Sequence, residues 1–279
     1  MQEQAKKTKF KKSDRTKKFA DPSEVEPGKL WSLASVLSVL IAWSLASYLD
    51  VVSDLFLPSP AQVLEEFYAI GFTEGYRGHY LWGHIGISLY RVFIGWGLGC
   101  LIGIPVGLGM GINTIARGIA DPLVELYRPV PPLAYIPLII IWFGIGDDGK
   151  IMLLFLASFS IIVINSRSGV KSASVEKIHA AYTLGANHWQ IVRRVILPNA
   201  MPEILTGMRV AMGIAWATLV AAEMVAAKSG VGWMVLNASR YLRTDIVIMG
   251  IMVMGVTGYF IDLGMRSMQR KLIPWKGKL

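Results

Sequence analysis

The sequence has little charge and almost no cysteine. Only 17% of its 279 residues are charged, whereas 53% are hydrophobic, and the mean hydropathy is +0.48. An ordinary soluble domain carries about a quarter of its residues as charged side chains, so this composition excludes that class. The single cysteine, Cys100, cannot form an internal disulfide. Apolar runs of membrane length recur along the chain, and they predict an all-α integral membrane protein.

The residues that catalysis and metal binding require are also scarce. Four histidines and one cysteine show no metal-ligand spacing, and no serine elbow or catalytic triad is present. The segment GIGDDGKI, residues 144–151, has the glycine and lysine spacing of a phosphate-binding loop. Such a loop needs Ser or Thr after the lysine to hold magnesium, and Ile151 stands there instead. We therefore expect no enzyme activity, no cofactor and no metal in this chain.

By hydropathy and approximate length, six apolar runs are predicted to be membrane spans. They are residues 30–49, 85–110, 120–144, 151–165, 204–227 and 246–268. The predicted organisation is a basic tail over 1–29, a transmembrane domain over 30–268 and a second tail over 269–279. On the non-cytoplasmic side, Ser59 as a cap and Pro60 at the first helical position predict a surface helix over about 59–70.

The basic residues orient the chain, because Lys and Arg gather on the cytoplasmic side of membrane proteins. With the N-terminus inside, 20 of the 28 Lys and Arg fall on the cytoplasmic side and five on the outer side. Both termini are therefore predicted to be cytoplasmic. The basic tail is interpreted as a topology signal, with contact to anionic lipid as the alternative. The net charge of +9 flanks apolar spans and forms no stripe on a soluble module, so we expect no nucleic-acid partner.

A row of glycines marks the second run. Gly95, Gly99, Gly103, Gly107 and Gly111 recur every four residues, on one face of a helix. Lipid offers as much apolar contact as a side chain does, so membrane helices associate through close packing. Small residues at this spacing let two helices approach closely. The pattern predicts a tightly packed central helix.

The third run is interrupted by five prolines, which predict a broken helix. Irregular backbone at membrane depth survives only where protein or a water-filled cavity satisfies it. Glu125 and Arg128 beside the break either face a pathway or pair at the membrane rim. Arg209 and Glu223 are about 21 Å apart along one helix, so each needs another partner. The candidate pathway residues are Glu125, Tyr127, Arg128, Pro131, Tyr135, Arg209 and Glu223.

The stretch over about 167–200 is too polar to cross a bilayer, although it lies between two spans. It predicts two short helices joined at Gly185, with Asn187 capping the second helix and Pro198 ending it. The first helix has an apolar face of Ile178, Ala181 and Leu184. A short helix of this kind suits a groove in another protein.

This stretch resembles the "EAA" loop of ATP-binding-cassette (ABC) importer permeases, in which E-A-A is followed at fixed spacing by Gly and by I-x-L-P. Here His179 replaces the Glu and Val195 the Ile, while Gly185 and the Leu-Pro pair keep their places. The resemblance assigns coupling to an ATPase to His179, Ala180, Ala181, Leu184, Gly185, Ala186, Leu197 and Pro198. It extends over most of the chain from about residue 30, through LPSPAQV, LYRPVPPLAYIPLIIIWFGIGDDGKI, MPEILTGMRVAMGIAWATLVAAEM and MQRKLIPWKGK.

These runs are similar to the taurine, alkanesulfonate and nitrate branch of that family. The resemblance implies a type I importer fold in a bacterial inner membrane, a second copy of the chain, two ATPase subunits that bind ATP and Mg, and a soluble binding protein. It implies taurine as the substrate, with another sulfonate, nitrate or bicarbonate as alternatives. A stand-alone channel or carrier remains a different class, but it has no use for an EAA-type loop. A membrane enzyme would need a catalytic constellation.

Overall fold

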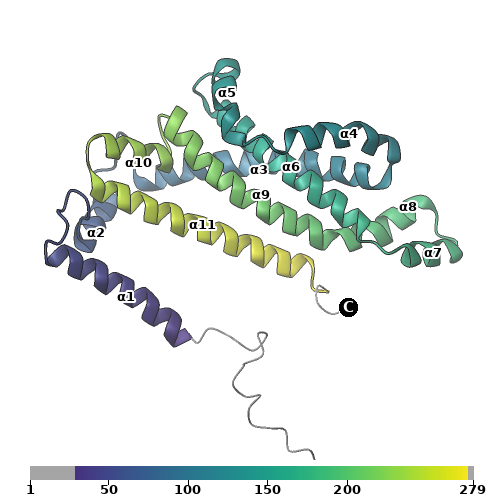
Figure 1. Ribbon diagram of the computed structural model, residues 1–279, viewed down its shortest axis with the longest axis horizontal. Coiled ribbons are helices and arrows are strands. Elements are labelled where there is room, and N and C mark those ends of the chain that lie inside the picture. Colours follow the sequence, from purple (N-terminus) through teal and green to yellow (C-terminus); the bar gives the residue numbers. More distant parts are fainter. Residues whose placement is uncertain (1–28, 276–279) are drawn as a thin grey trace, which may run out of the picture. The chain divides into compact units, whose positions relative to one another are not determined.

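The structure, a computed structural model, describes residues 29–275 (Figure 1), so most of the predicted basic tail and residues 276–279 lie outside it. The chain divides into two units, Met1–Val52 and Ser53–Leu279. The first contains α1, Lys29–Tyr48, whose leucine and valine side chains are largely exposed. Within residues 29–275 every regular secondary-structure element is a helix. An isolated β-bridge joins Tyr76 and His79.

Four helical runs of the second unit are long and apolar enough to cross a membrane. They are α3 (Leu81–Ile112), α6 (Asp147–Lys171), the run His188–Ala226 that ends in α9 (Leu197–Ala226), and α11 (Thr244–Leu272). Figure 1 shows them lying lengthwise beside one another. The short helices α7 (Val175–Thr183) and α8 (His188–Ile191) lie at one end, and α2 (Pro60–Tyr68) and α10 (Val231–Arg240) lie at the opposite end.

The predicted count of six continuous spans is not confirmed. The expected span over 120–144 is two pieces, α4 (Thr114–Tyr127) and the run Pro132–Phe143, bent by 86°. The second piece begins as a 3₁₀ turn, η3 (Pro132–Tyr135), and continues as α5 (Ile136–Phe143). Prolines 129, 131 and 132 have no N–H to donate, so a continuous hydrogen-bond ladder cannot pass this point. The bend therefore follows from the proline run.

The predicted helix end at Pro198 is wrong. After α8 the chain forms a π-helical turn, η4 (Val192–Ile196), and then continues directly into α9. Pro198 is the second residue of α9, directly after the π-helical turn, and the chain stays helical through it. The fifth span is consequently longer than the apolar run over 204–227 suggests. Asn187 does cap α8, and it forms a reciprocal capping box with Gln190.

The glycine face of α3 packs against α6. A Cβ added to each glycine would meet α6 at intervals of four residues: Leu154 from Gly95, Ser158 from Gly99, Ile162 from Gly103, Ser166 from Gly107 and Val170 from Gly111. Both residue numbers rise together, so α3 and α6 run parallel. α9 runs the other way, because Gly169 of α6 meets Ala200 while Ser88 and Arg91 of α3 meet Glu223. This three-helix stack is the centre of the second unit.

Short helices flank the end of the stack where α3 begins. The Ser59 hydroxyl accepts from the Gln62 N–H at 3.2 Å, and the Gln62 side chain accepts from the Ser59 N–H at 2.7 Å, which caps α2. α2 continues as a π-helical turn, η2 (Ala69–Thr73), and Phe72 and Phe67 pack edge-on against Trp82 of α3. α10 packs on both α9 and α11.

Candidate functional site

Arg91 is the centre of a buried ionic network that the sequence patterns did not identify. Its side chain is 2% exposed in the described structure, although it carries a permanent charge. Nη1 donates to Oε1 of Glu223 at 2.6 Å and to the carbonyl oxygen of Ser229 at 2.8 Å. Nε and Nη2 donate to Oδ1 of Asp147 at 2.9 and 2.7 Å. One guanidinium therefore joins α3, the first turn of α6, the end of α9 and the loop that follows it.

Glu223 is satisfied entirely from inside the protein. The Ser88 hydroxyl oxygen lies 2.8 and 2.9 Å from the two carboxylate oxygens, and the Gly232 N–H donates to Oε2 at 3.0 Å. The Glu223 side chain is 1% exposed. Glu223 was predicted as a candidate pathway residue, and in this conformation its carboxylate faces Arg91 and backbone. A charge in a membrane span is retained only with such partners.

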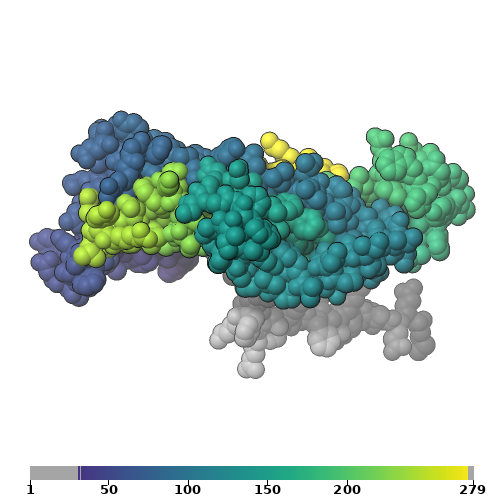
Figure 2. Space-filling model, turned by 90° about the horizontal axis from the view of Figure 1, so that it is seen from above, coloured from purple at the N-terminus to yellow at the C-terminus, as the bar shows by residue number. Residues whose placement is uncertain are grey.

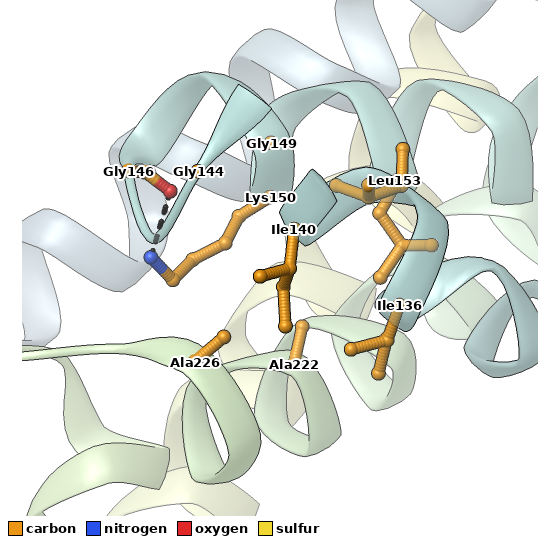
Figure 3. Close-up of a pocket in the computed structure, with 10 residues that line it drawn as sticks. Ile136, Ile140, Gly144, Gly146, Gly149, Lys150, Leu153, Ala222 and Ala226 are labelled. Atoms are coloured by element: carbon orange, nitrogen blue, oxygen red, sulfur yellow. Dashed lines mark hydrogen bonds between the residues drawn. The ribbon is translucent and has the colours of Figure 1, made fainter. Parts of the chain in front are cut away.

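Lys150 lies beside this network in a small cavity between α5, α6 and α9. Its Nζ donates to the Gly146 carbonyl oxygen at 2.8 Å and lies 3.9 Å from Oδ1 of Asp147. Figure 3 shows the Lys150 chain reaching this carbonyl, with Ile136 and Ile140 opposite Ala222 and Ala226. The cavity is about 20 Å³, which suits one water molecule and is too small for an organic substrate. The phosphate-loop-like segment is thus a tight turn between two helices.

Arg209 also has its own partner, Asp262 of α11. Nε donates to Oδ1 at 2.6 Å and Nη2 to Oδ2 at 3.2 Å, while Arg266 donates to the same carboxylate at 2.7 Å. The Arg209 and Asp262 side chains are each 35% exposed. Neither Arg209 nor Glu223 can reach the other, as the sequence spacing indicated. Their partners, Arg91 and Asp262, lie on other helices, so a local sequence pattern could not predict them.

The remaining candidate pathway residues gather at the bend between α4 and η3. Glu125 and Arg128 are exposed and, within the described residues, form no ion pair with each other. Tyr127 and Tyr135 stack across the bend with ring centroids 5.7 Å apart, and Pro131 precedes the 3₁₀ turn. The Tyr127 hydroxyl is buried without a hydrogen-bond partner in the described part of the chain. The bend therefore presents polar groups beside irregular backbone.

The predicted coupling residues lie on a projecting element. Figure 2 shows residues of α7 and α8, in green, protruding at one end of the second unit. Gly185 between them has φ +80°, a left-handed conformation that L-residues rarely adopt, and open space surrounds it. His179, Ala180 and Leu184 are exposed, and the exposed fraction of Leu184 is 87%.

The other members of the set turn inward. Ile178, Ala181 and Ala186 pack on the buried residues Val170, Ala173, Ile191 and Ile196, so the expected docking face is divided. Leu197 and Pro198 are half-buried at the start of α9.

Glu176 lies at the N-terminus of α7. Hydrogen bonds from the Glu176 backbone N–H and from Ser174 lower the pKa of its carboxyl group. This carboxylate complements the positive end of the helix dipole.

Within residues 29–275 no three His, Cys, Asp or Glu side chains are grouped as a metal ion would require. Arg91 and Asp147 were missed as functional residues. They could have been found as charged residues at the edges of predicted spans, because an ionisable group inside a membrane needs a partner.

Comparisons with known proteins identify relatives of this chain. The TauC taurine transport system permease protein of Escherichia coli (strain K12) is 48% identical over 228 residues, which are 82% of this chain and 83% of that protein. A putative aliphatic sulfonates transport permease protein, SsuC of Bacillus subtilis (strain 168), is 36% identical over 81% of this chain and 80% of its own length. The nitrate import permease protein NrtB of Leptolyngbya laminosa is 28% identical, with 77% and 78% covered.

Solved structures support the fold. An inward-facing MetNI methionine ABC transporter chain aligns with a TM-score of 0.59 and 20% identity, over 69% of this chain and 97% of that one. The family model for binding-protein-dependent transport system inner membrane components matches residues 99–274, which are more than half of the sequence. The chain therefore belongs to the family of binding-protein-dependent transport system inner membrane components.

Proposed function

We propose that this chain forms the membrane pathway of an ATP-driven importer for taurine, which a soluble binding protein delivers from outside. As a member of its family it is an ABC importer permease and a multi-pass protein of the inner membrane. The observation that carries the taurine assignment is the 48% identity to TauC, which runs through 82% of the chain. The sulfonate and nitrate permeases are less similar, at 36% and 28% identity, and they define the alternative substrates.

We propose that two copies of this chain assemble with two ATPase subunits, which bind ATP and Mg. The projecting element of α7 and α8 supports this arrangement, because it exposes Leu184, Ala180 and His179 on a short helix beside a left-handed glycine. A helix of this size can enter a groove on an ATPase subunit. Ile178 and Ala181 hold its inner face to the permease, so motion of the helix would be transmitted to α6 and α9.

We propose six membrane crossings with both termini in the cytoplasm. α3 and α6 run parallel, so the chain between them has to return to its starting side, which makes the bent pair α4 and α5 one crossing. α1 has 20 residues, about 30 Å of helix, which matches a hydrocarbon core. The excess of Lys and Arg on one side supports an orientation with α7 and α8 in the cytoplasm and the Arg91 network near the outer surface.

We propose that the substrate passes along the bend between α4 and α5. Glu125, Arg128, Tyr127, Pro131 and Tyr135 lie there, and exposed polar groups beside broken backbone are typical of a lined cavity. Arg209 and Glu223 have partners within the bundle, and we assign them to structural ion pairs.

The test is uptake of radiolabelled taurine by proteoliposomes that contain the permease, its ATPase and ATP, with the binding protein outside. Taurine should accumulate, and an ATPase variant that cannot hydrolyse ATP should abolish accumulation. Unlabelled alkanesulfonate, nitrate and bicarbonate are the competitors. Transport of one of these without taurine would replace the substrate assignment. Taurine flux through the permease without the ATPase would instead indicate a channel or carrier.

A further inference from the structure

Arg91 is shared by two carboxylates that differ in burial. Glu223 is 1% exposed and Asp147 is 50% exposed, whereas the arginine between them is 2% exposed. A buried arginine needs at least one permanent counter-charge, because an unpaired charge in a membrane span is costly. Glu223 meets that need by itself. The contact to Asp147 is therefore a second ion pair that the fold does not require for neutralising the arginine.

The Glu223 half of the network is built to be permanent. Ser88 and the Gly232 N–H hold the carboxylate, and the Val231 N–H donates to the Ser88 hydroxyl at 3.0 Å. A Cβ at Gly232 would lie 3.0 Å from the Glu223 Cβ, so the loop after α9 is seated closely on this side chain. Moving Glu223 would disrupt α3, α9 and α10 together.

The Asp147 half is built to separate. Asp147 opens α6 directly after a short turn in which Gly144 has φ +73° and Gly146 follows two residues later. Arg91 of α3 holds the turn against the bundle by donating to Asp147. Within the turn, Lys150 donates to the Gly146 carbonyl oxygen. α5 precedes it and has exposed Ile141, at 77%. A glycine-flanked turn with a half-exposed carboxylate can release Arg91 while Asp147 stays on the same helical turn as the buried Lys150, its second partner at 3.9 Å.

We propose that the contact between Arg91 and Asp147 is a latch for the turn between α5 and α6, closed in one state of the transport cycle and open in the other. Arg91 acts as a positioning residue: it stays on Glu223 throughout and captures or releases Asp147. Release frees the C-terminal end of α5, whose N-terminal end adjoins the proposed pathway bend through η3. The latch rests on the proposed function only in that the chain alternates between two conformations, and it does not depend on the substrate.

The test compares amide hydrogen exchange of the assembled transporter, without nucleotide and trapped with a non-hydrolysable ATP analogue. The peptide over 143–149 should change its exchange between the two states in the unmodified protein. In Asp147→Asn it should exchange about fivefold faster in the latched state, the factor expected when a half-exposed carboxylate loses its ion pair with Arg91 and its longer contact with Lys150. The difference between the two states should largely disappear. Peptides of α3 and α9 should be unchanged, since Arg91 keeps Glu223.

Asp148→Asn is the matched control, because it removes the same charge from the same helical turn. Asp148 is exposed and, within the described residues, forms no ion pair. Equal exchange in Asp147→Asn and Asp148→Asn would overturn the latch. So would exchange in the unmodified protein that is the same in both nucleotide states. Failure of Asp147→Asn to assemble would overturn it too, because the contact would then be required for folding. None of these outcomes depends on taurine uptake, which tests the proposed function separately.

Discussion

The guanidinium of Arg91 donates to the carboxylate of Glu223 across 2.6 Å, although the two residues are 132 positions apart in the sequence. Both side chains are buried, so each charge depends on the other for neutralisation. The pair fixes the end of α9 against α3, and the loop over 229–232 closes around it.

Removing Glu223 should destabilise the protein strongly. In Glu223→Ala, Arg91 retains Asp147 and the carbonyl and hydroxyl oxygens of Ser229, and breaking a buried ion pair costs about 3–5 kcal/mol. We expect a marked fall in melting temperature and in yield, measured by fluorescence-detected size-exclusion chromatography after heating. Glu125→Ala, which truncates an exposed glutamate, should melt close to the unmodified protein. Similar melting of the two variants would show that the buried pair adds no net stability.

A methyl group on the glycine face of α3 should block assembly of the helix stack. In Gly107→Ala the new Cβ would lie 2.6 Å from the Cβ of Ser166 and closer still to the Val163 carbonyl oxygen. Backbone cannot yield to such a contact, so the helices must separate. Gly109→Ala is the control on the same helix, because no atom lies within 4 Å of its added Cβ. Yield and melting temperature of the two variants should differ sharply. Equal values would mean that α3 tilts at little cost.

Gly185 should tolerate Asn better than Val. Its φ of +80° costs a residue with a Cβ about 1–2 kcal/mol, Asn adopts such backbone more readily, and β-branched Val suits it least. Because the surroundings are open, the effect arises from backbone conformation and not from a clash. We expect Gly185→Val to reduce ATPase copurification and uptake, with normal membrane insertion, while Gly185→Asn stays near normal. Normal coupling in the valine variant would rule out a fixed turn in the docking element.

Asp262 should matter more than either arginine that it binds. It accepts hydrogen bonds from Arg209 on α9 and Arg266 on its own helix, so Asp262→Ala removes both pairs. Each pair is partly exposed and worth up to about 1 kcal/mol. Arg266→Ala removes only the pair within the helix. Melting temperatures should fall in the order Asp262→Ala, Arg209→Ala, Arg266→Ala, from the largest effect to the smallest. A double variant of Arg209 and Asp262 that melts like Asp262→Ala would confirm their coupling.

Residues that act through their own backbone or their own helix face could be predicted from the sequence. Gly95 to Gly111 share a face through simple four-residue spacing, and α6 does lie on that face. Gly185 and Asn187 mark a turn and a cap because their chemistry is local. The prolines of the third run predicted a break, and the chain bends by 86° there. Pro198 misled the prediction, because a proline that follows a π-helical turn inside a longer helical run and one that ends a helix look the same in sequence.

By itself the sequence determined that the chain enters a membrane as packed helices, because hydropathy and small-residue spacing act through composition and period. It also indicated, by resemblance, the family to which the chain belongs. The tertiary structure alone decided which charges meet. Arg91, Asp147 and Glu223 come from three different helices, and their pairing depends on the register in which α3, α6 and α9 pack. That register is set by steric contact at glycines such as Gly107 against Ser166, which no one-dimensional pattern of charge contains.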